Sequence, residues 1–550
     1  MEGSARNRTK PHVLFFLADD LGWAEVGFNH PKPTEAAPTR TLNNLAAEGV
    51  RLGRHYMHAF CSPSRSAIQS GRAPLHVNAV NSHWYVSNSG DPVGGFAGVP
   101  RNMTGLGSVM QRGGYATHYV GKWDAGSATP DHTPLGRGYQ TSLHYFTHEI
   151  DYWTFKTGSG ALDLWQTDRP APELVNHPGC TEKSQRSGPR HKCTYADSLF
   201  EERVHAILDE HDQRAPLFLF WAPHLIHGPM QVPFDELDDG YTLPDSACHS
   251  KGATSLLLTK RAMVKHLDAS LGRVVQRARD NGMWSSLLLI FASDNGGSRY
   301  TGGNNFPLRG GKKTNWEGGI RVPALVSGGF VPLAVRGTVE SGLTAGWDWY
   351  RTLAGLAQVD VHDRRAEAAG LPAVEGDSHD LWPLLSGREA LSPRTQILLA
   401  TQRCPLSMCE IDEDYDSGHR VMIGGVIEPP FKLVLGETST GTTTAGEGWS
   451  LGPHLQDVQS CKGGEDRDGV TTCGRTSETG CLFNLYDDPG EQTNLARAMP
   501  MVFNRMYAAA VDASKTVYSP YRGQTLGRDA LETRLVATNA SLAFVGPFLP

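Results

Sequence analysis

The chain contains four short runs of apolar residues, and each run stops abruptly at polar side chains. Uninterrupted apolar runs of this length are typical of strands buried on both faces, as in parallel sheets. Apolar residues at helical spacing occupy two of the segments between them, 41–49 and 256–281. This alternation predicts an α/β fold with a doubly wound, mostly parallel sheet. The four runs are residues 13–17, 117–120, 217–221 and 287–291.

The polar residues that follow these runs are expected to meet, because ligands of doubly wound sheets lie beyond the carboxyl ends of the strands. Carboxylate and amide oxygens suit Ca²⁺ or Mg²⁺, whereas a lysine and a histidine suit an oxyanion. Each residue alone would be an ordinary turn or helix cap, but together they predict a pocket for a divalent cation and an anionic ester. The residues are Asp19, Asp20, Lys122, His227, Asp294 and Asn295.

A cysteine stands at the start of a predicted short helix. The segment reads CSPSRSAIQSGR from Cys61, with Pro63 near its beginning and Gly71 near its end, which is a start-and-stop pattern for a helix. The free N–H groups and the positive dipole end at such a start favour an anion. Cys61 is therefore a candidate reactive residue, although a lone cysteine is more often buried and inert.

Composition and charge argue against two kinds of partner. The chain of 550 residues has a net charge of −7 and no long basic run, which argues against nucleic acid. The apolar run 13–18 is too short to span a membrane. It leads directly into Asp19 and Asp20, as a core strand would. We therefore expect no membrane span and see no signal peptide.

The cysteines indicate an oxidising compartment. Apart from Cys61, eight remain, and we expect Cys180 with Cys193 and Cys404 with Cys409 to close surface loops as disulfides. A zinc site is the rival interpretation, but the chain lacks its C-x-x-C spacing. Glycosylation sequons occur as well, so we expect a secreted or lysosome-like location although no leader is visible. The sequons begin at Asn7, Asn102 and Asn539.

The segment that begins at Cys61 is similar to the sulfatase signature, C-x-P-S-R with a later G-R. Other segments resemble arylsulfatases over nearly the whole chain, and the arylsulfatase B (N-acetylgalactosamine 4-sulfatase-like) group in particular. The resemblance implies an alkaline-phosphatase-like fold with a smaller C-terminal antiparallel sheet and a closing helix. It also implies hydrolysis of aryl or carbohydrate sulfate esters. Matching segments include PHVLFFLADDLGWAEVG, GGYATHYVGKWDAG, LRGGKKTNWEGGIRVPAL and CLFNLYDDPGEQTNLA.

The resemblance assigns roles to the polar residues after the apolar runs and to residues of the segment that begins at Cys61. It implies that a formylglycine-generating enzyme converts Cys61 to formylglycine, which then lies beside one Ca²⁺ ion. Arg65 would support the hydrated aldehyde. The implied metal ligands are Asp19, Asp20, Asp294 and Asn295, next to Cys61. The other implied catalytic residues are Lys122, His227 and Lys312.

The implied reaction uses the two hydroxyls of the aldehyde hydrate in turn. One hydroxyl attacks sulfur, helped by Ca²⁺ and a carboxylate such as Asp294, while His227 or Lys312 protonates the leaving alcohol. Lys122, Lys312 and the ion stabilise the charge on the sulfuryl group. The second hydroxyl then loses its proton and expels sulfate, an exit that serine or cysteine does not offer.

One residue departs from the family pattern G-K-W-H-x-G, because Asp124 stands where a histidine usually touches the formylglycine. An ionised carboxylate accepts hydrogen bonds but donates none, and it adds negative charge near an anionic substrate. We expect an altered pH dependence or substrate preference, with His118 or His132 as candidates to compensate. Asp124 is therefore included among the candidate catalytic residues.

The chain is expected to divide into a catalytic domain, 10–395, and a C-terminal part, 396–550, with strands near 431–436 and 482–486 and a helix near 500–514. Segment 438–468 is rich in Gly, Thr and Ser and is expected to be a loop insertion.

Two other functions stay open: a phosphonate monoester or phosphodiester hydrolase of the same superfamily, and an inactive sulfatase-like binding protein. We expect substrate specificity to reside in loops 76–104 and 140–165. Candidate sugar contacts there are His144, His148 and Tyr152.

Overall fold

A ten-stranded sheet forms the centre of the computed structural model, with strand order β11-β2-β10-β9-β1-β8-β4-β5-β6-β7. The structure describes residues 10–182 apart from 33–37 and a few positions between 80 and 89, and then 184, 193–237, 251–401, 422–439, 470–518, 535–537 and 542–549. The strands are β11 Thr338–Glu340, β2 Val50–Leu52, β10 Ala324–Ser327, β9 Leu287–Ser293, β1 His12–Ala18, β8 Leu217–Ala222, β4 Ala116–Lys122, β5 Thr141–Tyr145, β6 Trp165–Gln166 and β7 Arg169–Pro170.

The four apolar runs of the sequence form four neighbouring central strands, which confirms the predicted fold class. β1 pairs in parallel with β9 on one side and with β8 on the other, and β8 pairs in parallel with β4. β10 runs antiparallel to β9, so the sheet is mixed at that side. All residues of β1, β8 and β9 are buried, as expected for strands covered on both faces.

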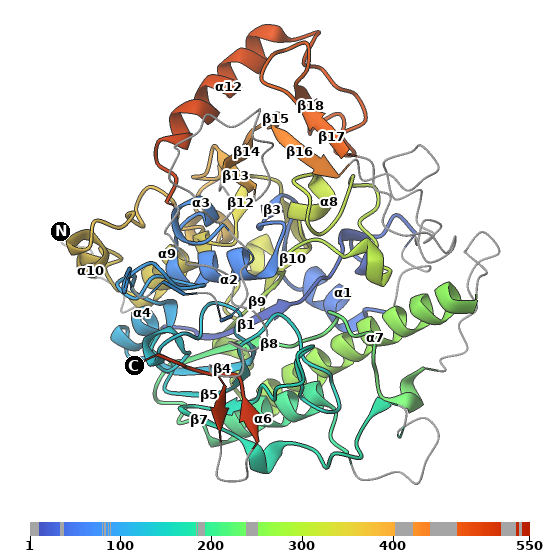
Figure 1. Ribbon diagram of the computed structural model, residues 1–550, viewed down its shortest axis with the longest axis vertical. Coiled ribbons are helices and arrows are strands. Elements are labelled where there is room, and N and C mark those ends of the chain that lie inside the picture. Colours follow the sequence, from blue (N-terminus) through green and yellow to red (C-terminus); the bar gives the residue numbers. More distant parts are fainter. Residues whose placement is uncertain are drawn as a thin grey trace.

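Helices cover both faces of this sheet (Figure 1). Alternate side chains of β1 belong to different cores: Phe15 packs in the core that contains α2, α4 and α9, and Phe16 packs in the core that contains α1, α6 and α7. The helices of the first core are α2 Cys61–Ser70, α4 Leu106–Arg112 and α9 Asp348–Ala357. Those of the second core are α1 Arg40–Ala47, α6 Ala196–Glu210 and α7 Lys251–Asp280.

A smaller antiparallel sheet follows in the chain, with strand order β13-β14-β15-β18. It lies near the top of Figure 1 with α12, Pro500–Ser514, beside it. Leu433 and Leu482 of this sheet share a core with Phe503 and Met506 of the helix, so the predicted closing helix buries one face of the sheet. The strands are β13 Ile397–Thr401, β14 Met422–Glu428, β15 Phe431–Val434 and β18 Cys481–Asn484.

The described cysteines agree with the expected disulfide-closed loop, since Cys180 and Cys193 are bonded. A second disulfide, not anticipated from the sequence, joins Cys473 and Cys481. Cys61 is the free cysteine of the described part of the chain and is buried. Among the described residues, no helix is both long and apolar enough to cross a bilayer. The expected Cys404–Cys409 bridge, nearly all of the loop insertion, and the sequons at Asn7 and Asn539 lie outside the described residues.

Candidate active site

The parallel register of β1 and β9 places the acidic residues side by side. Ala18 is opposite Ser293 in that register, so Asp19 and Asp294 are the next residues of two adjacent strand ends. The backbone N–H of Asp20 donates to Asp294 Oδ1 at 3.2 Å, and Asn295 Nδ2 donates to Asp20 Oδ1 at 2.8 Å. The convergence expected from the sequence is present in the fold.

Helix α2 brings the cysteine to the same place, and Gly71 in the left-handed conformation (φ 70°) follows its last residue. The Cys61 thiol lies 3.6 Å from Asp19 Oδ1. Arg65 stands one turn further along the helix, where its Nε and Nη2 donate to Asp294 Oδ2 at 3.0 and 2.8 Å. Burial, and then the charge of Asp294, raises the pKa of the Cys61 thiol well above its usual value.

Two lysines flank the thiol. Lys122, at the end of β4, donates to Asp19 Oδ2 at 2.8 Å. Lys312 Nζ lies 3.1 Å from Cys61 Sγ and 2.6 Å from Asp20 Oδ1. Burial alone would lower the pKa of both lysines, but Asp19 raises that of Lys122 and Asp20 raises that of Lys312. Both ammonium groups therefore stay charged in a buried site.

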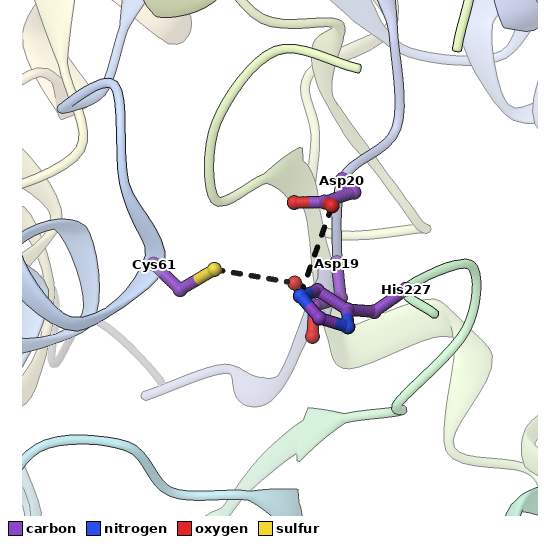
Figure 2. A group of neighbouring side chains, drawn as sticks. All are labelled: Asp19, Asp20, Cys61 and His227. Carbon is purple, nitrogen blue, oxygen red and sulfur yellow. Dashed lines mark hydrogen bonds and ion pairs between the residues drawn. The ribbon is translucent and has the colours of Figure 1, made fainter. Parts of the chain in front are cut away.

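The acidic cluster, which consists of Asp19, Asp20 and Asp294 with the adjacent Asn295, has the chemistry of a cation site. The ligand atoms of Asp19, Asp20, Cys61 and His227 all lie within 4.8 Å of one another, and Figure 2 shows these side chains converging. Asn295 Oδ1 is buried and has no hydrogen-bond partner among the described residues. A buried carbonyl oxygen without a donor is costly, and a hard cation would satisfy it. The residues therefore fit a Ca²⁺ or Mg²⁺ ion.

His227 and His224 occupy different positions on the loop after β8. His227 Nε2 lies 3.8 Å from Asp20 Oδ2, at the rim of the acidic cluster. His224 is fully buried and stacks on Tyr152 with ring centroids 4.3 Å apart. The sequence-based preference for His227 over His224 as the site residue therefore agrees with the geometry.

Asp124 lies at the wall of a small cleft that is also lined by Ser62, the residue after Cys61. Ser62 Oγ lies 2.8 Å from its Oδ1, and His148 Nδ1 lies 3.0 Å from the same oxygen. His118 bonds to Thr141 instead, at 2.7 Å. His132 bonds to Thr129 at 2.8 Å. His118 and His132 therefore bond elsewhere, and the histidine that lies beside Asp124 is His148. The cleft is lined by Ser62, Asn78, Trp84, Asp124, Thr147 and His148, among others.

Two of the three expected sugar contacts are wrong in this structure. His144 is fully buried and packs edge-on against Phe146 with ring centroids 4.6 Å apart. Tyr152 is also buried, and its hydroxyl donates to the carbonyl oxygens of His224 and His227 at 3.1 and 2.9 Å. Both support the fold behind the site, whereas His148 lines the cleft.

The fold and the site define an enzyme for anionic esters. Its acidic cluster lies beside Cys61 at the start of α2. The family model for sulfatases matches residues 11–359. The chain belongs to the sulfatase family, which confirms the resemblance drawn from its motifs and makes it a sulfuric ester hydrolase.

Several known proteins are similar to this chain. Mouse arylsulfatase J is 28% identical over 94% of the chain and 77% of its own length. Pig N-acetylgalactosamine-6-sulfatase is 26% identical over 89% of the chain and 82% of its own length. The crystal structure of Ps i-CgsB in complex with k-i-k-neocarrahexaose covers 95% of this chain and 96% of that chain, with a TM-score of 0.65 and 21% identity. That structural likeness shows a shared fold.

Proposed function

We propose that this sulfatase works through a formylglycine formed at Cys61 and one Ca²⁺ ion. The observation that carries the proposal is the thiol at the start of α2, 3.6 Å from Asp19 and 3.1 Å from Lys312 Nζ. The residues that would hold the ion are Asp19, Asp20, Asp294 and Asn295. Formylglycine, once water has added to its aldehyde, would supply two hydroxyls on one carbon, one to attack sulfur and one to lose its proton and expel sulfate. Ca²⁺ would supply positive charge beside them.

Four other residues are proposed to position the site, to neutralise charge and to protonate the leaving alcohol. Arg65 holds Asp294 through two nitrogens, so it fixes one wall of the site. Lys122 and Lys312 place two positive charges around residue 61, where they neutralise charge on the transferring sulfuryl group. Burial, and then Lys312, lowers the pKa of His227, so a proton on Lys312 is held more firmly than one on His227. Both residues are proposed to face the leaving alcohol.

The substrate class is proposed to be a carbohydrate or aryl sulfate. A cleft with Trp84 and several hydroxyl and amide side chains fits a sugar, because aromatic faces and polar groups together suit carbohydrate rings. One relative is named for N-acetylgalactosamine 6-sulfate hydrolysis, and one neighbour was solved with a neocarrahexaose. The disulfides, together with the sequon at the half-buried Asn102, support a secreted or lysosome-like location. Conversion of Cys61 would require a formylglycine-generating enzyme as a partner during maturation.

The direct test combines mass spectrometry of the peptide that contains Cys61 with an aryl sulfate assay. Protein from the native host should carry formylglycine, and its activity should be lost after chelation and restored by Ca²⁺. An aryl phosphate diester should be hydrolysed more slowly. Faster diester turnover would favour the phosphohydrolase. An unmodified Cys61 thiol in protein from the native host, together with no sulfatase activity, would favour the inactive binding protein.

A second experiment separates the roles of Lys312 and His227. The group that protonates the leaving alcohol matters more when the alcohol is a poor leaving group. We therefore expect one of Lys312→Ala and His227→Ala to lose much more activity on an alkyl sulfate than on a nitrophenyl sulfate. Equal losses on both substrates for both variants would assign neither residue as the acid.

A further inference from the structure

The pair formed by Asp124 and His148 joins two separate strand ends. Asp124 follows β4 and His148 follows the neighbouring strand β5, which pairs with β4 in parallel. His148 Nδ1 lies 3.0 Å from Asp124 Oδ1 and 3.1 Å from Oδ2. A carboxylate that binds one ring nitrogen fixes the orientation of the histidine ring.

The burial of the two side chains shows which of them faces the cleft. The side chain of His148 is 26% exposed, and that of Asp124 is 7% exposed. Both line the cleft with Ser62, the residue after Cys61. The imidazole ring, rather than the carboxylate, is thus the larger surface offered to a bound molecule at this wall.

The charges of the pair suit an anion. Burial alone would raise the pKa of Asp124, but His148, and then Lys122, lowers it below its usual range. Lys122 is 3.8 Å from the carboxylate, which is too far for a hydrogen bond. A bare carboxylate would repel a sulfate ester. When the ring carries a proton on both nitrogens, the carboxylate accepts from Nδ1–H and Nε2–H is a hydrogen-bond donor in its place.

We propose that His148, held by Asp124, contacts the bound sulfate ester. Two residues from neighbouring strand ends then replace the one histidine that is usual at position 124. This inference rests on the proposed sulfatase function. It assigns His148 as a substrate-contacting residue and Asp124 as the residue that positions it.

The test moves the imidazole ring from one position to the other. His148→Ala should lower kcat/KM for an aryl sulfate about 10- to 100-fold, the range expected for one hydrogen bond to a charged group. Asp124→Asn should lower it less, because the ring remains but loses its anchor. The double variant Asp124→His with His148→Ala should recover most of the loss. His118→Ala, which removes a histidine bonded to Thr141, should keep the activity of the parent.

Binding of inorganic sulfate to the unmodified protein, measured by calorimetry, gives a readout that does not depend on turnover. His148→Ala should weaken it, and the double variant should restore it. Parental sulfate affinity in His148→Ala would overturn the inference. A second result would also overturn it. In that case His148→Ala keeps the parental melting temperature and formylglycine content but loses activity, and the double variant does not restore the activity. Failure of the proposed function shows differently, as a matured parent that hydrolyses no aryl sulfate.

Discussion

Each carboxylate of the acidic cluster has one cation as its nearest charged partner. A buried charge is tolerated when it is paired and hydrogen-bonded, and removing one partner leaves the other unpaired at a large cost. The three carboxylates and the three cations therefore balance one another before an ion or a substrate binds, and each cation serves both the fold and the anion to be bound. The pairs are Asp19 with Lys122, Asp20 with Lys312 and Asp294 with Arg65.

Arg65→Met should destabilise the protein by about 3–5 kcal/mol, because it leaves the Asp294 carboxylate buried without its partner. Urea unfolding followed by circular dichroism measures the change. Arg169→Met is the matched control, since Arg169 also pairs with a carboxylate, that of Glu173, but the two side chains are 56% and 47% exposed. That variant should lose less than about 1 kcal/mol. Similar losses in the two variants would contradict the account of burial.

At the scale of elements, strand ends explain both what the sequence predicts and what it misses. Fully buried apolar runs identify β1, β8 and β9, and the shorter run 117–120 identifies β4, so the residues that follow these strands could be assigned to one crevice. The strand β5 reads TSLHY and its first residue is only half-buried, so its polar composition hides it from the same rule. His148 follows this strand, which is why its pairing with Asp124 could not be predicted. The pairing depends on the β4–β5 register.

The end of α2 offers a prediction about how the helix is held. Gly71 has φ 70°, and a Cβ there would lie 2.5 Å from the ring of Tyr350 on α9. Gly71→Ala should therefore cost more than the ~1 kcal/mol of a left-handed alanine, and it should lower activity by shifting residue 61. Gly282→Ala is the control, because Gly282 has φ 73° with nothing within 4 Å.

Comparing Gly71→Ala with Gly282→Ala separates the cost of the left-handed backbone from the cost of the clash with Tyr350. Thermal unfolding should show a loss of about 1 kcal/mol for Gly282→Ala and at least twice that for Gly71→Ala. Activity should fall in the second variant alone. Equal destabilisation would mean that α2 and α9 adjust to the added methyl group, and that their packing does not fix the position of residue 61.

At the scale of the whole molecule, a buried ionic group connects the small sheet to the catalytic part. Lys432 of β15 lies 3.0 Å from Glu317 and 2.8 Å from Glu491, and all three side chains are fully buried. Glu317 begins α8, Glu317–Ile320, which follows the loop of Lys312. The division at 10–395 and 396–550 stays a prediction, but this contact shows that the two parts meet in a buried region close to the loop of Lys312.

Lys432 is shared by two carboxylates, and Glu317 has Arg321 as a second cation at 3.6 Å, so Glu491 is the carboxylate that binds a proton more readily. Burial, with Glu317 adding to it and Lys432 opposing it, raises the pKa of Glu491 to about 7, compared with about 4.3 in an unfolded chain. A carboxyl group with a raised pKa binds its proton more tightly in the folded protein. Its stabilising contribution is therefore complete below about pH 4 and is lost as the pH rises to about 7.

Glu491→Gln keeps a neutral side chain at every pH and removes this dependence. The free energy of unfolding of the parent should fall relative to that of the variant by about 3 kcal/mol between pH 4 and pH 8. Urea unfolding at several pH values measures it. Glu478→Gln, at a glutamate that is 73% exposed, should follow the parent throughout. Parallel curves for the parent and Glu491→Gln would mean that Glu491 is ionised in the folded protein, and that Lys432 balances two carboxylates at the junction of the two sheets.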